Sequence, residues 1–355
     1  MTNFSADRRD FLNSFMPQSA AGDAVMVPVG ASTVRIATRA MACEFGAALN
    51  PGSHESVSAV SDALEMVHEI EGWLSIYRST SEMSQVNREA ATQEVRVRPE
   101  LMEILQLSRN LFERTGGAFD IAAGAQVSLW RRCRQQQRIP TEHEIKAALA
   151  ASGSEHLELN SETGGVRFGI TELQLDPGAI GKGYALDQLG DWLSPDRPRV
   201  PHSFLLHGGR SSVLARGSHN ELDGWPVGLG NPLFTNRRLG TVLLKNQAMA
   251  TSGSNIQFFR CDGRRYGHIL DPRTAMPVDG MLSVTVLAES AALADALSTA
   301  FFVLGVENAQ KCCDNLENVS VILIPFPDGK RVRPVLLGVP LGQIFWDDEQ
   351  VVVPG

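Results

Sequence analysis

The sequence predicts an α+β fold in which helices pack on mixed or antiparallel sheets. Two helical periodicities occupy the first third of the chain, and short strand-like runs dominate the second half. With 355 residues, 43% hydrophobic and only 20% charged, a chain of this size can bury roughly 70–75% of its unfolded surface. These observations exclude a disordered or fibrous protein. The length fits one large domain or two closely packed ones.

The first half of the chain divides into five segments. Residues 1–30 are small, polar and without period, and are expected to form a loose arm. Residues 34–49 alternate like strands. Residues 56–76 carry apolar side chains at intervals of three and four, which is typical of an amphipathic helix. A second such helix is expected over 99–115, ended by a pair of glycines. Residues 131–138, RRCRQQQR, are interpreted as the solvated end of a helix.

The second half is mostly strand. The expected strands are Leu157–Leu159, Val166–Phe168, Leu173–Leu175, Phe204–Leu206, Val242–Leu244 and Ser283–Val286. A hairpin is predicted where Gln257–Arg260 and Arg265–Leu270 flank Asp262-Gly263, because this dipeptide favours a tight primed turn.

The end of the chain is predicted to hold one further helix and two strands. Ser290 is a suitable N-cap for an Ala- and Leu-rich helix that Gly305 would close. Strands are expected at Ser320–Pro325 and Pro334–Gly338, and the acidic tip Asp347-Asp348-Glu349 is expected to be solvated.

Charge and composition exclude several classes of protein. The net charge of −8 argues against nucleic-acid binding, which needs a clustered basic face. The five cysteines form neither a disulfide framework nor a CxxC metal knuckle. Because we find no apolar run of the roughly 18–20 residues that a membrane helix needs, we expect no stable membrane insertion.

The N-terminal segment resembles a twin-arginine export signal. Arg8-Arg9 precede a variable residue and Phe11-Leu12. An export signal needs an apolar stretch next, whereas Asn13, Gln18 and Asp23 interrupt it here. We therefore expect an incomplete signal on a cytoplasmic protein. The alternative is export to the periplasm.

Asp295 and Thr299 could share a metal ion. Four residues apart on a helix, they lie on one face, so a carboxylate and a hydroxyl oxygen can converge on a hard cation such as Mg²⁺. The alternative is a solvated Asp and a Thr that bonds back to its own helix.

The segment Asp176 to Tyr184, DPGAIGKGY, could bind a phosphate. Three glycines and Lys182 at the start of a helix offer N–H groups and a point charge to an anion. The spacing is not that of a P-loop, so an ordinary tight turn is the alternative. We expect Lys182 to matter more to binding than to structure.

Two further segments could contribute to a site. Gly116 to Asp120, GGAFD, could present backbone amides and an aromatic face to a flat ligand; the alternative is a helix C-cap followed by a core Phe119. His268 could act as a base, because a neutral imidazole titrates near working pH. A structural histidine is the alternative.

Taken in order, these segments resemble the ApbE family of FAD:protein FMN transferases, formerly called thiamine biosynthesis lipoproteins. The resemblance spans about Met41 to Gly305. Its motifs are Met41-Ala42-Cys43, Leu74 to Arg78, Ser81-Glu82 through Asn87, Gly116 to Asp120 reaching Trp130, Asp176 to Tyr184, Gly208-Gly209, Trp225 to Pro232, Thr251-Ser252-Gly253, His268 to Thr274 with Pro277, and Ala294 to Gly305.

The resemblance implies a T-fold-related transferase domain over 31–345, between the arm and a tail at 346–355. It implies an FAD pocket lined by Met41, Tyr77, Ala118, Phe119, Asp120, Asp176, Lys182 and His268. It also implies Mg²⁺ held by the Ala179 carbonyl with Asp295 and Thr299. The reaction would attach FMN through a phosphoester to a Thr or Ser of a client redox protein and release AMP, with His268 or Asp295 helping to deprotonate the hydroxyl.

The chain departs from the family at several positions. Ile121-Ala122 replace Pro-Thr, Arg210 replaces an acid after Gly208-Gly209, Ser254-Asn255 replace an acid and an aromatic, and Ala275 replaces a glycine. These changes leave the metal and pyrophosphate residues intact. The sequence therefore supports FAD binding more strongly than it supports FMN transfer. An FAD pyrophosphatase that yields FMN and AMP, and a flavin-binding paralogue without turnover, remain as alternatives.

Overall fold

The computed structural model describes residues 33–234, 236–254, 258–327, 331–347 and 351. The arm at 1–30 with its twin-arginine-like segment, and also Asn255, Gln257, Asp348 and Glu349, lie outside the described residues. The described helices are α2 (His54–Leu74), α3 (Glu82–Glu89), α4 (Pro99–Arg114), α5 (Gly124–Gln135), α6 (Glu142–Ala150), α7 (Gly181–Trp192) and α8 (Ala291–Cys313).

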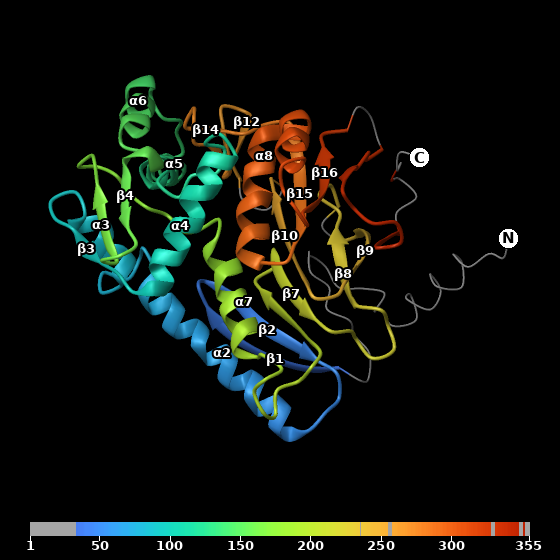
Figure 1. Ribbon diagram of the computed structural model, residues 1–355. Helices are drawn as coiled ribbons and strands as arrows, with labels where there is room; N and C mark the ends of the chain where they lie inside the picture. Colours follow the sequence, from blue (N-terminus) through green and yellow to red (C-terminus); the bar gives the residue numbers. More distant parts are fainter. Residues whose placement is uncertain (1–32, 235, 255–257, 328–330, 348–350, 352–355) are drawn as a thin grey trace.

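An eight-stranded antiparallel sheet forms the centre of the fold (Figure 1). In spatial order its strands are β1 (Val34–Ala40), β2 (Cys43–Leu49), β6 (Phe204–Gly208), β7 (Ser212–Arg216), β10 (Gln247–Gly253), β15 (Met281–Ala288), β16 (Ser320–Pro325) and β17 (Val335–Leu337). The order places the N-terminal hairpin β1–β2 beside β6, a strand from the middle of the chain.

Helices and a second sheet cover the two faces of the central sheet. On one face, α2, α7 and α8 bury their apolar sides, among them Val60, Leu189 and Phe301. On the other face, Trp225 and Val242 belong to a separate buried cluster. This cluster lies under a sheet of β18 (Ile344–Trp346), β9 (Arg238–Leu244) and β8 (Trp225–Gly230). Burial of each such side chain stabilises the fold by about 1.5–3 kcal/mol.

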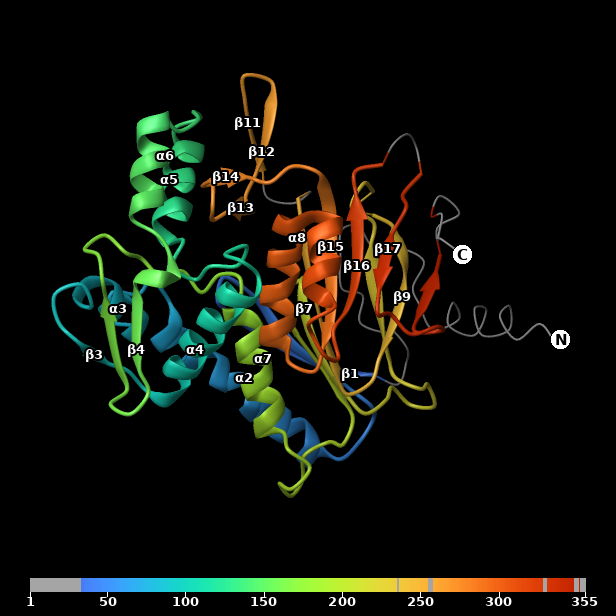
Figure 2. The ribbon, with the colours of Figure 1, turned by 45° about the horizontal axis from the view of Figure 1, so that its top comes forward.

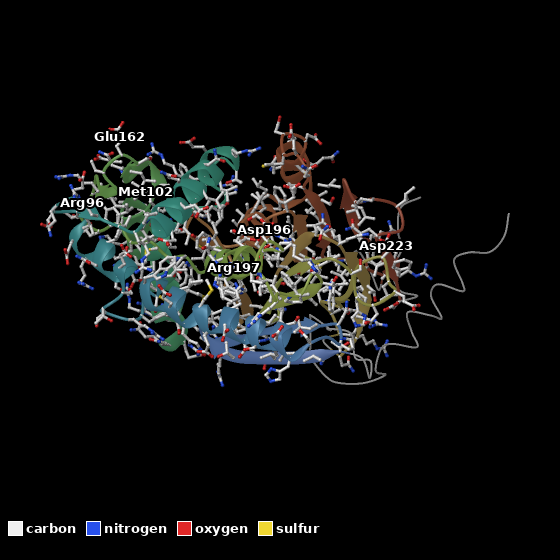
Figure 3. The ribbon with its side chains drawn as sticks, turned by 60° about the horizontal axis from the view of Figure 1, so that its bottom comes forward. Arg96, Met102, Glu162, Asp196, Arg197 and Asp223 are labelled. Carbon is white, nitrogen blue, oxygen red and sulfur yellow. The ribbon has the colours of Figure 1, made fainter. Side chains whose placement is uncertain are left out.

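The remaining elements extend from the helical face. A small sheet of β3 (Val95–Arg96), β5 (Gly165–Phe168) and β4 (Leu157–Asn160) lies beside α3 and α4. Two hairpins, β11–β12 (Phe258–Cys261 and Arg264–Gly267) and β13–β14 (Leu270–Asp271 and Met276–Pro277), lie near α5. Figure 2 shows β11–β12 projecting from the rest of the ribbon. Arg96 and Asp223 mark opposite ends of the molecule (Figure 3).

The structure confirms the α+β prediction and most predicted elements. Ser290 caps α8, because its hydroxyl accepts a hydrogen bond of 3.1 Å from the Leu293 N–H. Asp262 and Gly263 form the predicted primed turn, with φ of 49° and 76°. The predicted strand Leu173–Leu175 is wrong: the backbone of Leu175 hydrogen-bonds the side chain of Asn87 instead of a strand.

Three expectations for the C-terminal third need correction. Gly305, with φ of 69° and ψ of 179°, kinks α8 but does not close it. Among the described residues, α8 alone is long and apolar enough by length and composition to cross a membrane, contrary to the expectation that no such run exists; 61% of its most apolar stretch is buried within the fold. Asp347 is not simply solvated, because it forms an ion pair with Arg238.

Candidate active site

The residues singled out from the sequence lie around one cavity of about 730 Å³. This volume is within the range of small-molecule sites. The cavity is lined by Met41, Tyr77, Ala118, Phe119, Asp120, Asp176, Ala179, Lys182, His268, Asp295 and Thr299. The fold therefore brings together residues from the first hairpin to the last long helix.

Asp295 is the buried anion of this cavity. Its side chain is 6% exposed and its Oδ2 accepts hydrogen bonds of 3.2 Å from the Lys182 ammonium and from the Gly183 N–H. Its Oδ1 accepts a bond of 3.1 Å from the Ser212 hydroxyl. Gly183 lies in the first turn of α7, where the helix dipole favours a negative charge. Lysine and helix N-terminus together compensate the buried carboxylate.

Thr299 supplies a second oxygen one turn further along α8. Its Oγ1 lies 3.0 Å from the Ser252 Oγ, which lies 2.9 Å from the Ser298 Oγ. These hydroxyl groups join α8 to β10. Thr299 also bonds back to the Asp295 carbonyl at 3.5 Å, as the alternative interpretation expected. The hydroxyl and the carboxylate nevertheless both line the cavity.

This donor set fits Mg²⁺. Asp295, Thr299 and the neighbouring Ala179 offer only oxygen atoms, the ligands that this hard cation prefers. Within the described ranges, no three His, Cys, Asp or Glu side chains are grouped for metal binding. A divalent ion here would therefore rely on one carboxylate and neutral oxygens, and would complete its shell with water and substrate phosphate.

Two glycines in the first turn of α7 are required for packing. A Cβ on Gly183 would lie 2.1 Å from the Ala291 carbonyl oxygen, and one on Gly181 would lie 2.9 Å from a methyl group of Leu74. Asp187 completes the contact, because its carboxylate accepts bonds of 2.7 Å from both the Ser290 hydroxyl and the Ala291 N–H. Burial raises the pKa of Asp187. The segment thus fixes α7 against the start of α8, which carries Asp295.

Asp120 holds a loop in place. Its carboxylate accepts bonds from the Ala122 N–H at 2.8 Å and from the Ser154 hydroxyl at 2.5 Å. Burial raises the pKa of this carboxyl group. Its neighbour Phe119 is 3% exposed and belongs to the main core. The C-cap interpretation of this segment therefore holds, although both residues also border the cavity.

Tyr77 and Arg131 form a polar and aromatic wall of the cavity. The Arg131 guanidinium lies 5.2 Å from the centre of the Tyr77 ring and 3.9 Å from Asp176. The Asp176 carboxylate also accepts a bond of 2.9 Å from the Gly178 N–H. Tyr77 is 75% exposed, so its other face can stack on a flat ligand. The interpretation of residues 131–138 as merely solvated missed this contact.

Met41 and Ala42 form the two-residue turn between β1 and β2. Ala40 pairs with Cys43, and Met41 and Ala42 have φ of 48° and 58°. This is the backbone of a primed turn, which favours Gly or Asn because a Cβ is strained there. Both residues line the cavity. Strained turns of this kind cluster at ligand sites.

Aromatic residues form a further wall next to His268. The Trp130 ring lies 5.7 Å from the Tyr266 ring, and its Nε1 donates a bond of 2.7 Å to the Ala275 carbonyl. Ala275 has φ of 53°, a backbone conformation that favours glycine, which is the residue that the family resemblance leads us to expect there. His268 and Arg210 are exposed and both line the cavity. The charge reversal at Arg210 therefore lies within the site.

The comparisons with known proteins agree with this arrangement. The sequence profile described as the ApbE family matches residues 33–323. The chain belongs to the ApbE family. A curated ApbE relative from Treponema pallidum, named FAD:protein FMN transferase, is 32% identical over 313 residues, which cover 84% of this chain and 82% of the relative. One from Klebsiella pneumoniae with the same name is 30% identical over 290 residues, covering 81% and 87%.

Solved structures of the ApbE family share the fold. The flavin transferase ApbE from Vibrio cholerae superimposes with a TM-score of 0.73 at 25% identity, covering 84% of this chain and 95% of that one. The ApbE protein of Thermotoga maritima superimposes with a TM-score of 0.74 at 27% identity, covering 82% and 94%.

Sequence reasoning missed several residues of the cavity and its support. Arg134 lines the cavity from α5, and Ser212 and Asp187 hold Asp295 and α8 in place. Nothing in a single basic or serine-containing stretch indicates which way it faces. Only the tertiary contacts reveal these roles.

Proposed function

We propose that this chain transfers FMN from FAD to an acceptor protein, the activity for which its curated relatives are named. The observation that carries the proposal is the buried Asp295 carboxylate, which faces Lys182 and the N-terminus of α7 inside a cavity of about 730 Å³. Such a site can accept a dinucleotide diphosphate together with a cation.

Asp295, Thr299 and Ala179 would hold Mg²⁺. When bound, this ion would neutralise part of the charge on the FAD pyrophosphate. Lys182 would release Asp295 and turn its ammonium group to the substrate phosphates. Tyr77 would stack on a ring of FAD, and Met41 and Phe119 would bound the pocket.

The acceptor is a protein carrying a Thr or Ser hydroxyl. Its oxygen attacks the phosphorus of the FMN half, the new P–O bond forms, and the bond to the AMP phosphate oxygen breaks. AMP leaves as a phosphate monoester. His268, exposed at the cavity wall, would accept the hydroxyl proton, because the Asp295 carboxylate would be engaged by the cation.

The experiment incubates the protein with FAD, Mg²⁺ and a panel of Thr- or Ser-containing peptides, and follows covalent flavin, AMP and free FMN by mass spectrometry. Covalent flavin on a peptide supports transfer. Free FMN and AMP with no labelled peptide would instead indicate an FAD pyrophosphatase, and unchanged FAD a binding paralogue.

Two variants link the reaction to the site. Asp295→Ala should abolish Mg²⁺-dependent turnover. Asp223→Ala is a matched control, because Asp223 is an exposed carboxylate at the far end of the molecule (Figure 3). Wild-type turnover in the Asp295→Ala protein would contradict the assignment.

A further inference from the structure

Arginines are concentrated beside the cavity of an otherwise acidic protein. Residues 131–138 contain four arginines and no acidic residue, and the hairpin at 258–267, FFRCDGRRYG, contains three arginines and one aspartate. The whole chain carries a net charge of −8. We define the arginine surface as Arg131 and Arg134 on α5 with Arg260 and Arg265 on β11–β12.

The two halves of this surface are packed together at the cavity. Trp130 of α5 lies 6.2 Å from Phe259 and 5.7 Å from Tyr266, measured between ring centres. Arg131 and Arg134 line the cavity, as does Phe258. Arg131 and Arg134 therefore border the cavity directly, and Phe258 brings the hairpin that carries Arg260 and Arg265 to its wall.

The arginines of the hairpin are placed unfavourably for the protein itself. Arg260 and Arg265 are directly opposite each other in the register of β11 and β12, and like charges in such a pair destabilise a sheet. Arg265 lies over the Phe258 ring at 4.0 Å and also donates to the Ser254 carbonyl.

Two of these guanidinium groups have no counter-charge. Arg134 and Arg260 are both exposed. In the part of the chain that the structure describes, neither has an ion-pair or hydrogen-bond partner. A repulsive pair on the hairpin and two uncompensated cations, one of them at the cavity wall, indicate a partner that brings negative charge.

We propose that the arginine surface is the docking site for an acidic segment of the acceptor protein; this inference rests on the proposed transfer function. The acceptor hydroxyl must reach into the cavity, so the residues that flank it pass over the rim. Asp or Glu side chains there would meet Arg260 and Arg134. The rest of the protein carries a net negative charge and would repel the same segment. This difference in charge would steer the acidic segment toward the arginine surface.

The test measures binding of labelled peptides by fluorescence anisotropy at low salt. One peptide carries a single Thr flanked by Asp and Glu, a second replaces those residues by Lys, and an oligonucleotide of equal length is the third probe. Wild type should bind the acidic peptide at least about 5-fold more tightly than the basic one, and added salt should weaken that preference.

Three variants of the full chain make the test specific. Arg260→Glu should remove most of the preference and also raise the melting temperature, because the new carboxylate would pair with Arg265 across the hairpin. Arg260→Lys should keep the preference. Arg96→Glu, an exposed arginine at the outer edge of the small sheet (Figure 3), should also keep it.

Several results would overturn the inference. These are equal binding of the two peptides by wild type, equal losses in the Arg260→Glu and Arg96→Glu proteins, or tighter binding of the oligonucleotide. FAD affinity is measured separately for each protein. A loss of FAD affinity in Arg260→Glu would assign the surface to the FAD site, and a wild-type protein that binds no FAD would count against the proposed function itself.

Discussion

The Lys182 ammonium lies 3.2 Å from the Asp295 carboxylate. The residue expected to bind the substrate phosphates and the residue expected to bind the metal ion therefore neutralise each other in this structure. The proposed metal binding at Asp295 would therefore compete with Lys182. This pairing revises the expectation that Lys182 matters more to binding than to structure, because its removal leaves a buried carboxylate with the Gly183 N–H and the Ser212 hydroxyl as its remaining donors.

Lys182→Met should lower the stability of the ligand-free protein by about 2 kcal/mol, the order expected when a partly buried ion pair loses one member. Mg²⁺ should raise the melting temperature of the variant more than that of wild type, since it would replace the lost positive charge. Thermal unfolding with and without Mg²⁺ measures both effects. Identical melting of the two proteins without ligand would contradict the role of the pair.

Gly183→Ala should separate α7 from α8. Its Cβ would lie 2.1 Å from the Ala291 carbonyl oxygen, so the helices must move apart and the site around Asp295 must loosen. We expect a loss of at least about 3 kcal/mol in the free energy of unfolding, as for severe overpacking, with weaker FAD binding. Gly72→Ala is the matched control: nothing lies within 4 Å of its Cβ, and in α2 it should stabilise by about 0.5–1 kcal/mol.

Ala42→Gly should stabilise the protein by about 0.5–1 kcal/mol. Ala42 is exposed and has φ of 58°, so the substitution relieves left-handed strain without removing a buried methyl group. The same change in a helix, Ala147→Gly in α6, should instead destabilise by about 1 kcal/mol. Urea denaturation of both variants checks the sign. A loss of stability in Ala42→Gly would show that this turn is not strained.

Stability should fall as the pH drops below about 6.5, partly through His219. Burial lowers the pKa of this imidazole, so the folded state binds a proton less readily than the unfolded state between the lowered value and 6.5. His219→Gln should therefore flatten the melting temperature between pH 5 and pH 7. His143→Gln, an exposed histidine, should leave the slope unchanged; an unaltered slope in His219→Gln would reject the assignment.

Local patterns in the sequence predicted those elements in which buried apolar side chains recur at regular spacing along one segment. The spacing of Val60, Val67 and Leu74 was enough for α2. Thr141 and Glu144 form a capping box that marks the start of α6, and this pattern of Thr followed three residues later by Glu is visible in the sequence. Leu175 shows the limit, since its apolar run suggested a strand while the distant Asn87 side chain takes its backbone hydrogen bonds.

In the candidate site, too, some residues could be predicted from the sequence and others could not. Asp295 and Thr299 could be paired from helical spacing, and their neighbours came from the family resemblance. The role of Arg131 could not be predicted from the sequence. Its guanidinium contacts Tyr77 and Asp176, which come from distant parts of the chain. Likewise, the glycines around the start of α7 suggested a phosphate cradle, and only the tertiary contacts reveal that packing already requires Gly181 and Gly183.

The strand order has a consequence for biosynthesis. Because β2 pairs with β6, more than 150 residues later in the chain, and α8 contributes Asp295 and Thr299, the pocket unites segments from nearly the whole polypeptide. Pairings of such long sequence separation close slowly and late. A nascent chain that has not yet emerged beyond α8 lacks Asp295 and Thr299, so the pocket can be completed only after the chain has been synthesised through α8.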